Sequence, residues 1–176
     1  MLMKNLLYYL VYGLWYALSL LPFWIHYLFS DFIYLILYKL LGYRVKVVRK
    51  NLTESFPEKS EKELRGIERK FYHRLCDYFV ELVKTMTMSD RQIRKRMVFK
   101  GAELVNQCAE EGQSVALYLG HTFNWEWITS MPYSVSDKFH CGQLYHAIEN
   151  PIFDKLLLRQ RERWSAECIA LVDIHS

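Results

Sequence analysis

The predicted fold depends most on the stretch SVALYLGHTFNWE, which runs from Ser114 to Glu126. Its first six residues are mostly apolar and have the length of a short buried strand. Gly120 and His121 follow, and residues 124–131 have a helical pattern. A strand, a polar loop and a helix in this order are typical of an α/β fold, in which ligands bind beyond the carboxyl ends of strands. The pattern therefore places a histidine where such a fold binds its ligands.

The segments on either side extend this alternation. We expect helices over 60–87, 89–96, 102–110 and 150–164, and strands over 97–99, 138–145 and 169–172. Several ends carry recognisable caps: Ser60 with Glu63 makes a capping box, and Asn150 with Pro151 suits an N-cap and first helical position. In the long helix over 60–87, the apolar face is predicted to include Phe71 and Phe79.

The first 43 residues have a different character from the rest. LLYYLVYGLWYALSLLPFWI, from Leu6 to Ile25, carries no formal charge and as a helix would cover the ~30 Å hydrocarbon core of a bilayer. Apolar sequence resumes directly afterwards. The segment lacks the small-residue cleavage site of a signal peptide, so we expect it to be retained. Pro22 would break or kink the helix, so a spanning helix and a bent interfacial pair both remain open. We divide the chain into a membrane-anchoring segment, 1–43, and an α/β domain, 44–176.

Charge is divided at nearly the same place as hydropathy. Residues 1–50 carry a net charge of +5, whereas the rest of the chain is close to neutral. Basic residues therefore do not cluster on the folded body, which argues against binding of nucleic acid. Arg44, Lys46, Arg49 and Lys50 are positioned either to meet anionic lipid head groups or to form an ordinary solvated turn. By the positive-inside rule the α/β domain is cytoplasmic, and residues 51–57 are expected to be a polar connector.

Metal and cofactor motifs are absent from the sequence. The four cysteines match no CxxC pattern, and His140, Cys141 and His146 lack a fourth ligand. The motifs of serine hydrolases, P-loop NTPases, Rossmann dehydrogenases and zincins do not occur. We therefore expect no metal and no cofactor.

His121 and Glu126 form the candidate catalytic pair. A loop between them can fold the carboxylate back toward the imidazole, where it would fix the tautomer and leave the other ring nitrogen as a general base. Such a pair taken alone is weak evidence, because a surface histidine followed by a helix-dipole carboxylate has the same spacing. The position after a predicted strand makes the catalytic interpretation more specific.

Three ordered blocks resemble a known family. HTFNWE, residues 121–126, looks like the HX4(D/E) box of the lysophospholipid acyltransferase superfamily. NLTESFPE, residues 51–58, and YHAIENPIFDKLLLRQRERW, residues 145–164, resemble segments of the lipid A biosynthesis (late) acyltransferases of Gram-negative bacteria. The resemblance covers nearly the whole chain, to about Asp173.

The resemblance implies transfer of a fatty acyl group from an acyl-carrier-protein thioester to a hydroxyl of a phosphorylated glycolipid, a lipid A precursor, at the cytoplasmic face of the inner membrane. It implies that His121 is the base and Glu126 its partner, with neither a covalent acyl-enzyme nor a metal. The remaining assignments are to substrate binding: Arg161 aligns best with the family's arginine, Arg159 and Arg163 are near alternatives, and Asn124 and Trp125 lie inside the box.

Two departures from the family's pattern qualify this expectation. His146 stands where many relatives have an arginine. Family members also continue beyond Ser176, so the chain is expected to be truncated at its C-terminus and its α/β sheet incomplete. Acylation of another membrane lipid, such as a lysophospholipid, aminolipid or mannolipid, and an inactive membrane-bound remnant are the alternatives.

Overall fold

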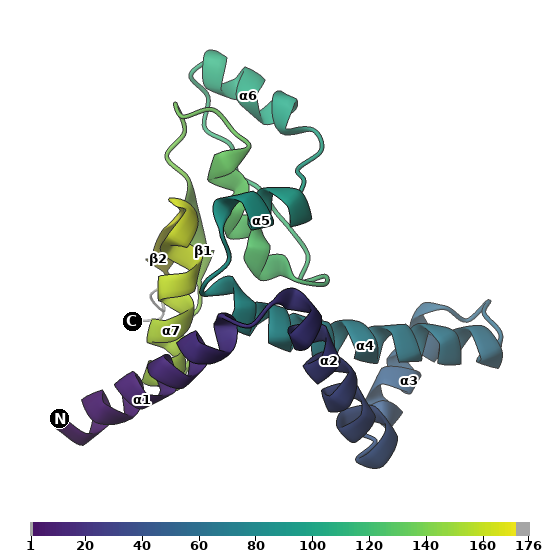
Figure 1. The fold of residues 1–176 in the computed structure, drawn as a ribbon. Helices are drawn as coiled ribbons and strands as arrows, with labels where there is room; N and C mark the ends of the chain where they lie inside the picture. Colours follow the sequence, from purple (N-terminus) through teal and green to yellow (C-terminus); the bar gives the residue numbers. More distant parts are fainter. Residues whose placement is uncertain (1, 172–176) are drawn as a thin grey trace, which may run out of the picture. The chain divides into compact units, whose positions relative to one another are not determined.

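The computed structural model describes residues 2–171, and contacts divide the chain into two compact units. One unit contains residues 1–16 and 85–176, and the other contains residues 17–84. The elements, labelled in Figure 1, are α1 (Leu2–Ser19), α2 (Phe23–Tyr34), the π-helix η1 (Leu35–Leu40), α3 (Val45–Ser55), α4 (Glu61–Thr85), α5 (Asp90–Arg96), α6 (Ala102–Glu110), the 3-10 helix η2 (Trp125–Tyr133), β1 (Gly142–Tyr145), α7 (Pro151–Arg161), the 3-10 helix η3 (Glu162–Trp164) and β2 (Glu167–Ala170). The described chain is thus mostly helical with a small parallel sheet, which agrees with the predicted α/β class at that coarse level.

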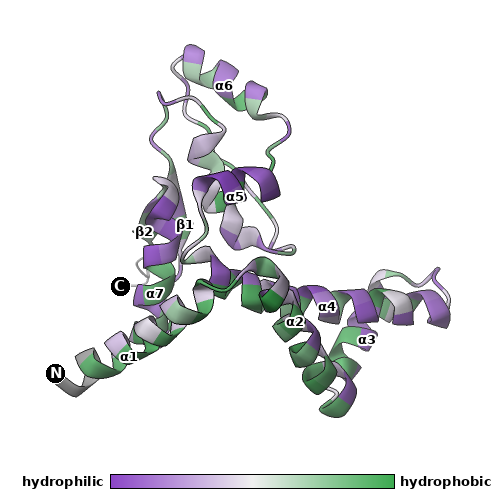
Figure 2. Cartoon of the chain, in the orientation of Figure 1, coloured by the Kyte–Doolittle hydropathy of each residue, from purple (hydrophilic) through white to green (hydrophobic). Residues whose placement is uncertain are grey.

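The N-terminal apolar sequence forms two helices rather than one. Helix α1 ends at Ser19 and α2 begins after Pro22, because proline has no N–H to continue the first helix. Within the described residues, no single helix is long and apolar enough to cross a membrane. The bent pair of Leu6–Ser19 and Phe23–Leu40 passes that test by length and composition only. Figure 2 shows α2 mostly green, which marks hydrophobic residues. Several of its apolar side chains are exposed, among them Trp24 and Leu28.

The core of the 17–84 unit is aromatic. Tyr34 from α2 and Tyr72 and Cys76 from α4 are buried together. The ring of Tyr38 stacks on that of Tyr72, with centroids 4.7 Å apart. Burial also raises the pKa of the Cys76 thiol to about 11, because the thiolate loses its hydration there. This core packs η1 and α2 against the middle of α4.

Polar contacts also join α2 to α4 within this unit. Tyr27 donates a 2.9 Å hydrogen bond to Glu81, and Ser30 donates a 2.8 Å hydrogen bond to Asp77. The buried Lys84 ammonium donates to the backbone carbonyl oxygen of Ser19 at 2.7 Å. Buried polar groups need such partners. The first two contacts fix the register between α2 and α4, and the third joins Ser19, the last residue of α1, to α4.

The predicted helix over 60–87 is confirmed as α4, but the prediction of its buried face was partly wrong. The Ser60–Glu63 capping box forms, with Ser60 N–H donating to the Glu63 carboxylate at 2.9 Å. Phe71 and Phe79 are exposed, whereas Tyr72 and Val80 are buried. The buried i, i+4 stripe of α4 runs from Leu64 through Tyr72, Cys76 and Val80, and Tyr72 and Cys76 pack with Tyr34 of α2.

The predicted connector over 51–57 was largely wrong. Helix α3 continues through Ser55, and only Phe56 to Ser60 link it to α4. Val45 and Val48 pack on the aromatic core, so tertiary contacts hold this polar sequence in a helix.

The core of the other unit joins α1 to α7. Tyr8, Met86 and Leu156 are buried together. The Lys155 ammonium lies 4.4 Å from the centroid of the Tyr8 ring, a distance at which cation–π attraction is significant. Side chains of α1 from Tyr8 to Trp15 therefore pack on α7, the helix that carries Arg159 and Arg161.

The sheet is a single βαβ unit. Strands β1 and β2 pair in parallel, with Gly142 opposite Glu167, and α7 makes the crossover that parallel strands require (Figure 1). The predicted strands over 138–145 and 169–172 are shorter or shifted, and Val172 lies outside the described residues. The predicted strands over 97–99 and 114–119 are wrong: both segments are irregular, since no strand in residues 2–171 pairs with them.

Candidate active site

His121 lies in the loop that precedes η2, on a segment exposed to solvent. Residues 114–119, expected to be a strand, are exposed throughout, and the Tyr118 side chain is 97% exposed. Phe123 adopts a left-handed conformation with φ 52°, which turns the chain into η2. The imidazole of His121 meets the Trp125 ring edge-on, with centroids 5.1 Å apart. An exposed imidazole held on one side by an indole remains accessible to a substrate.

Glu126 lies in the first turn of η2 and forms a buried ion pair with Arg161 of α7. Arg161 Nε donates to one carboxylate oxygen at 2.7 Å, and a terminal nitrogen donates to the other at 2.6 Å. The side chains are 7% and 17% exposed. Two parallel charge-assisted hydrogen bonds define both position and orientation, so the pair joins η2 rigidly to α7.

The structure does not join Glu126 to His121 directly. Both carboxylate oxygens accept hydrogen bonds from Arg161, and none of the hydrogen bonds of the described residues links the carboxylate to the imidazole. The Glu126 carboxylate is thus held by a cation, whereas the imidazole faces solvent. Of the two groups, His121 is the more available proton acceptor.

Tyr145, at the end of β1, is a neighbour of this ion pair that the sequence analysis did not assign to the site. The Arg161 guanidinium lies 5.8 Å from the centroid of the Tyr145 ring. Its position at the carboxyl end of a parallel strand is the signal that could have identified it, since ligands of α/β proteins bind there. The carboxyl end of β1, the last turn of α7 and the start of η2 therefore meet around Arg161.

The structure distinguishes the three candidate arginines by their partners. Arg161 pairs with Glu126, whereas Arg159 lies 4.8 Å from the centroid of the Tyr12 ring of α1. Arg163 donates to the carbonyl oxygens of Thr85, the last residue of α4, and of Met88, which follows it. Such donors satisfy carbonyl groups that a helix C-terminus leaves without partners. Arg163 thus has a structural position, and only Arg161 touches a predicted catalytic residue.

The remaining predicted site residues of the HX4(D/E) box, Asn124 and Trp125, lie between His121 and Glu126 in the chain. Asn124 immediately precedes η2, and both Asn124 and Trp125 are half-buried. Trp127 donates its indole N–H to the Thr85 hydroxyl at 2.9 Å, which anchors η2 to the end of α4.

Within residues 2–171, no group of three His, Cys, Asp or Glu side chains could hold a metal ion.

Comparison with known proteins gives one match. The model for the bacterial lipid A biosynthesis acyltransferase family matches residues 1–175, which is nearly the whole chain. No curated protein and no solved structure matches the sequence. The family match includes η2, β1 and α7, and therefore all the candidate site residues.

Proposed function

Because the chain belongs to the bacterial lipid A biosynthesis acyltransferase family, and is therefore an acyltransferase, we propose that it transfers a fatty acyl chain from an acyl-carrier-protein thioester to a hydroxyl of a lipid A precursor. The observation that carries the proposal is the exposed His121 imidazole, which packs on Trp125 and precedes Glu126 of the Glu126–Arg161 pair by five residues, within a chain that matches the family over residues 1–175. No acyl-enzyme, metal or cofactor takes part in the proposed reaction.

His121 is the proposed general base. The imidazole takes the proton of the acceptor hydroxyl as the hydroxyl oxygen attacks the thioester carbonyl carbon. The tetrahedral intermediate then collapses, the carbon–sulfur bond breaks, and the thiolate leaves and receives the proton from the imidazolium. An ester and a free thiol result, so the proton taken from the acceptor ends on the donor. The solvent-facing position of the ring supports this role.

Glu126 and Arg161 are the proposed positioning pair. The carboxylate stabilises the imidazolium electrostatically when the loop brings the ring toward η2 on substrate binding, since catalytic hydrogen bonds often tighten only in the complex. Arg161 holds the carboxylate in a fixed orientation through two hydrogen bonds. Asn124 and Trp125, which border His121 and Glu126 in the chain, are proposed to contact the substrate, as is Arg159.

The proposed location is the cytoplasmic face of the inner membrane. Exposed apolar side chains on both helices of the bent pair support an association with lipid, and among them are Leu10 and Leu14 of α1 and Trp24 of α2. Residues 1–43 would then anchor the chain, and residues 44–176 would contact acyl carrier protein and the glycolipid.

The test is an acyl-transfer assay on membranes that contain the chain, with labelled acyl-acyl carrier protein and a lipid A precursor. We expect His121→Ala to lower the rate by roughly 10²–10⁴-fold. His140→Ala is the matched control, because that imidazole is also exposed and lies in the same unit. Wild-type rates for His121→Ala would refute the role of the base.

The acceptor is tested separately by mass spectrometry of lipids from a deletion strain. A missing acyl chain on lipid A supports the proposed acceptor. Unchanged lipid A together with a change in a lysophospholipid, aminolipid or mannolipid would replace the acceptor but keep the chemistry. Absence of transfer to any of these lipids would indicate an inactive remnant.

A further inference from the structure

An open groove of about 520 Å³ lies in the 17–84 unit, far in sequence from the candidate active-site residues. Its walls come from η1, α3 and the N-terminal half of α4, and they include one acidic and four basic side chains. The lining residues are Tyr38, Arg49, Glu61, Lys62, Arg65 and Arg69. Such a concave, mostly cationic surface attracts an anionic group.

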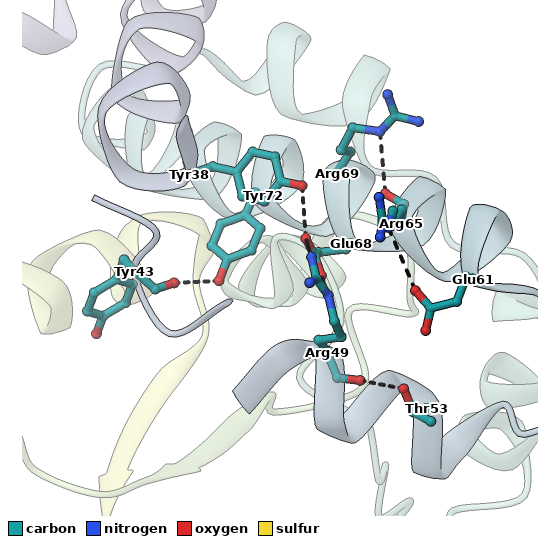
Figure 3. A network of polar contacts seen from close by, with 9 residues as sticks. All are labelled: Tyr38, Tyr43, Arg49, Thr53, Glu61, Arg65, Glu68, Arg69 and Tyr72. Atoms are coloured by element: carbon teal, nitrogen blue, oxygen red, sulfur yellow. Dashed lines mark hydrogen bonds and ion pairs between the residues drawn. The ribbon is translucent and has the colours of Figure 1, made fainter. Parts of the chain in front are cut away.

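Arg49 contributes little free charge to the groove, because it is already paired. Glu68, only 1% exposed, accepts hydrogen bonds from Arg49 Nε and a terminal nitrogen, both at 2.9 Å, and from the Tyr38 hydroxyl at 2.9 Å (Figure 3). This arrangement fixes Tyr38 and Arg49 as walls of the groove. Glu68 therefore neutralises part of the positive charge of the basic cluster that the sequence suggested at residues 44–50.

The charge available to a ligand lies on α4. Lys62, Arg65 and Arg69 are spaced by three and four residues, so they share one face of the helix. Among the described residues, Arg65 forms an ion pair with Glu61 alone, at 3.7 Å, and both side chains are more than 60% exposed. An exposed pair of this kind is weak and exchanges readily with solvent or a ligand.

Lys62 and Arg69 differ from Arg65 in their partners. No carboxylate within the described part of the chain forms an ion pair with either of them. Arg69 makes one long hydrogen bond, 3.4 Å, to the backbone oxygen of Arg65, shown in Figure 3. Its remaining N–H groups suit a tetrahedral oxyanion, which an arginine can bind through two donors at once.

Exposed apolar side chains of the same unit favour an anion that belongs to a lipid. Leu40 and Leu41 follow Tyr38 in the chain and are 73% and 68% exposed. The 17–84 unit thus carries exposed apolar side chains as well as a cationic groove, a combination typical of proteins at the membrane interface. Free inorganic phosphate would use the cations alone.

We propose that this groove binds the phosphate of an anionic membrane lipid, with Lys62, Arg65 and Arg69 as donors. The lipid source of the phosphate rests on the membrane association proposed above. The acyl-transfer reaction is not involved, and none of the groove residues belongs to the candidate active site. The groove would hold the 17–84 unit at the bilayer surface.

The test measures binding to the full chain in mild detergent, with short-chain phosphatidic acid as the probe. Short-chain phosphatidylcholine is the zwitterionic control, and inorganic phosphate is the free-anion arm. We expect Lys62→Ala/Arg69→Ala to weaken binding of phosphatidic acid by roughly tenfold or more, and to leave binding of phosphatidylcholine unchanged. Binding to the wild type should weaken as salt is added.

Lys70→Ala/Lys95→Ala is the matched control, because it also removes two exposed positive charges. Equal weakening in this control would overturn the groove and indicate a general charge effect. Inorganic phosphate that binds as tightly as phosphatidic acid would overturn the lipid assignment. The assay needs no turnover, and His121→Ala should bind like the wild type, so failure of the groove is distinguishable from failure of the proposed reaction.

Discussion

Two arginine–glutamate pairs of nearly identical geometry occur in the two units. Glu126 accepts two hydrogen bonds from Arg161, and Glu68 accepts two from Arg49. The carboxylates are similarly buried, at 7% and 1% exposure, but Arg161 is 17% exposed and Arg49 is 45% exposed. The two pairs therefore share the same hydrogen bonds but differ in how far the arginine is exposed to water.

The two pairs should respond differently to the loss of one member, because the remaining side chain has different access to water and to other hydrogen-bond partners. Arg161 would remain largely desolvated beside Tyr145, whereas Arg49 could turn to water. Glu68 has a further donor in the Tyr38 hydroxyl. Removal of one member of a buried pair is costly because it leaves an uncompensated charge. The Glu126–Arg161 pair is thus the more sensitive of the two, and it lies at the candidate active site.

The largest expected effect is that of Glu126→Ala. We expect it to lower the free energy of unfolding by about 3–5 kcal/mol, because Arg161 would keep its charge in a buried position. Chemical unfolding in detergent, followed by circular dichroism, measures this loss. The double variant Glu126→Leu/Arg161→Met should recover a good part of it, since it removes both charges. A double variant as unstable as the single one would contradict the explanation.

Glu68→Gln should have a smaller effect. The amide keeps the shape but loses the charge-assisted hydrogen bonds, and we expect a loss of about 1.5–3 kcal/mol. The same unfolding measurement gives the comparison directly. Should Glu68→Gln prove more destabilising than Glu126→Ala, exposure of the arginine would not be the property that separates the two pairs.

Acid should weaken the Glu68 pair. Burial alone would raise the pKa of this carboxyl, but hydrogen bonds from Arg49 and Tyr38 outweigh it and lower the pKa below the ordinary value of 4.5. The ionised group therefore contributes stability above about pH 4.5, and this contribution is lost as the pH falls through the lower, folded-state pKa. The gap in stability between wild type and Glu68→Gln should narrow over that range. A gap that stays constant down to pH 3 would exclude the linkage.

The smallest effect is expected at the exposed pair of Arg65 with Glu61. Glu61→Ala should change the free energy of unfolding by less than about 1 kcal/mol, because water screens both charges. Thermal unfolding at low and high salt provides the measurement. A loss comparable to that of Glu68→Gln would show that the groove is coupled to the core of its unit.

Local signals in the sequence predicted many helix boundaries. The Ser89 capping box opens α5, and Asn150 caps α7 by accepting hydrogen bonds from the N–H groups of Ile152 and Phe153. These signals act within four residues, so they are readable from neighbours in the chain. The predicted strand over 114–119 failed for the opposite reason, because a strand exists only where another strand pairs with it.

The site was predicted in part. The family resemblance singled out His121, Glu126 and three arginines, and a comparison over residues 1–175 places the chain in that family. The sequence did not show which arginine pairs with Glu126, because Arg159, Arg161 and Arg163 alternate closely on one helix end. The rotation of α7 against η2 selects Arg161, and Tyr145 comes beside it only through the βαβ crossover.

The order of amino acids was sufficient for the helix caps, the break at Pro22 and the family, because these depend on short-range chemistry or on motifs. Three features needed the folded chain: the partner of Glu126, the buried position of Glu68 and the cationic groove on α4. Each brings together side chains that are distant in sequence or on different elements. The electrostatic environment of these side chains depends on how deeply they are buried and on which groups they pair with. Neither property can be read from neighbouring residues in the sequence.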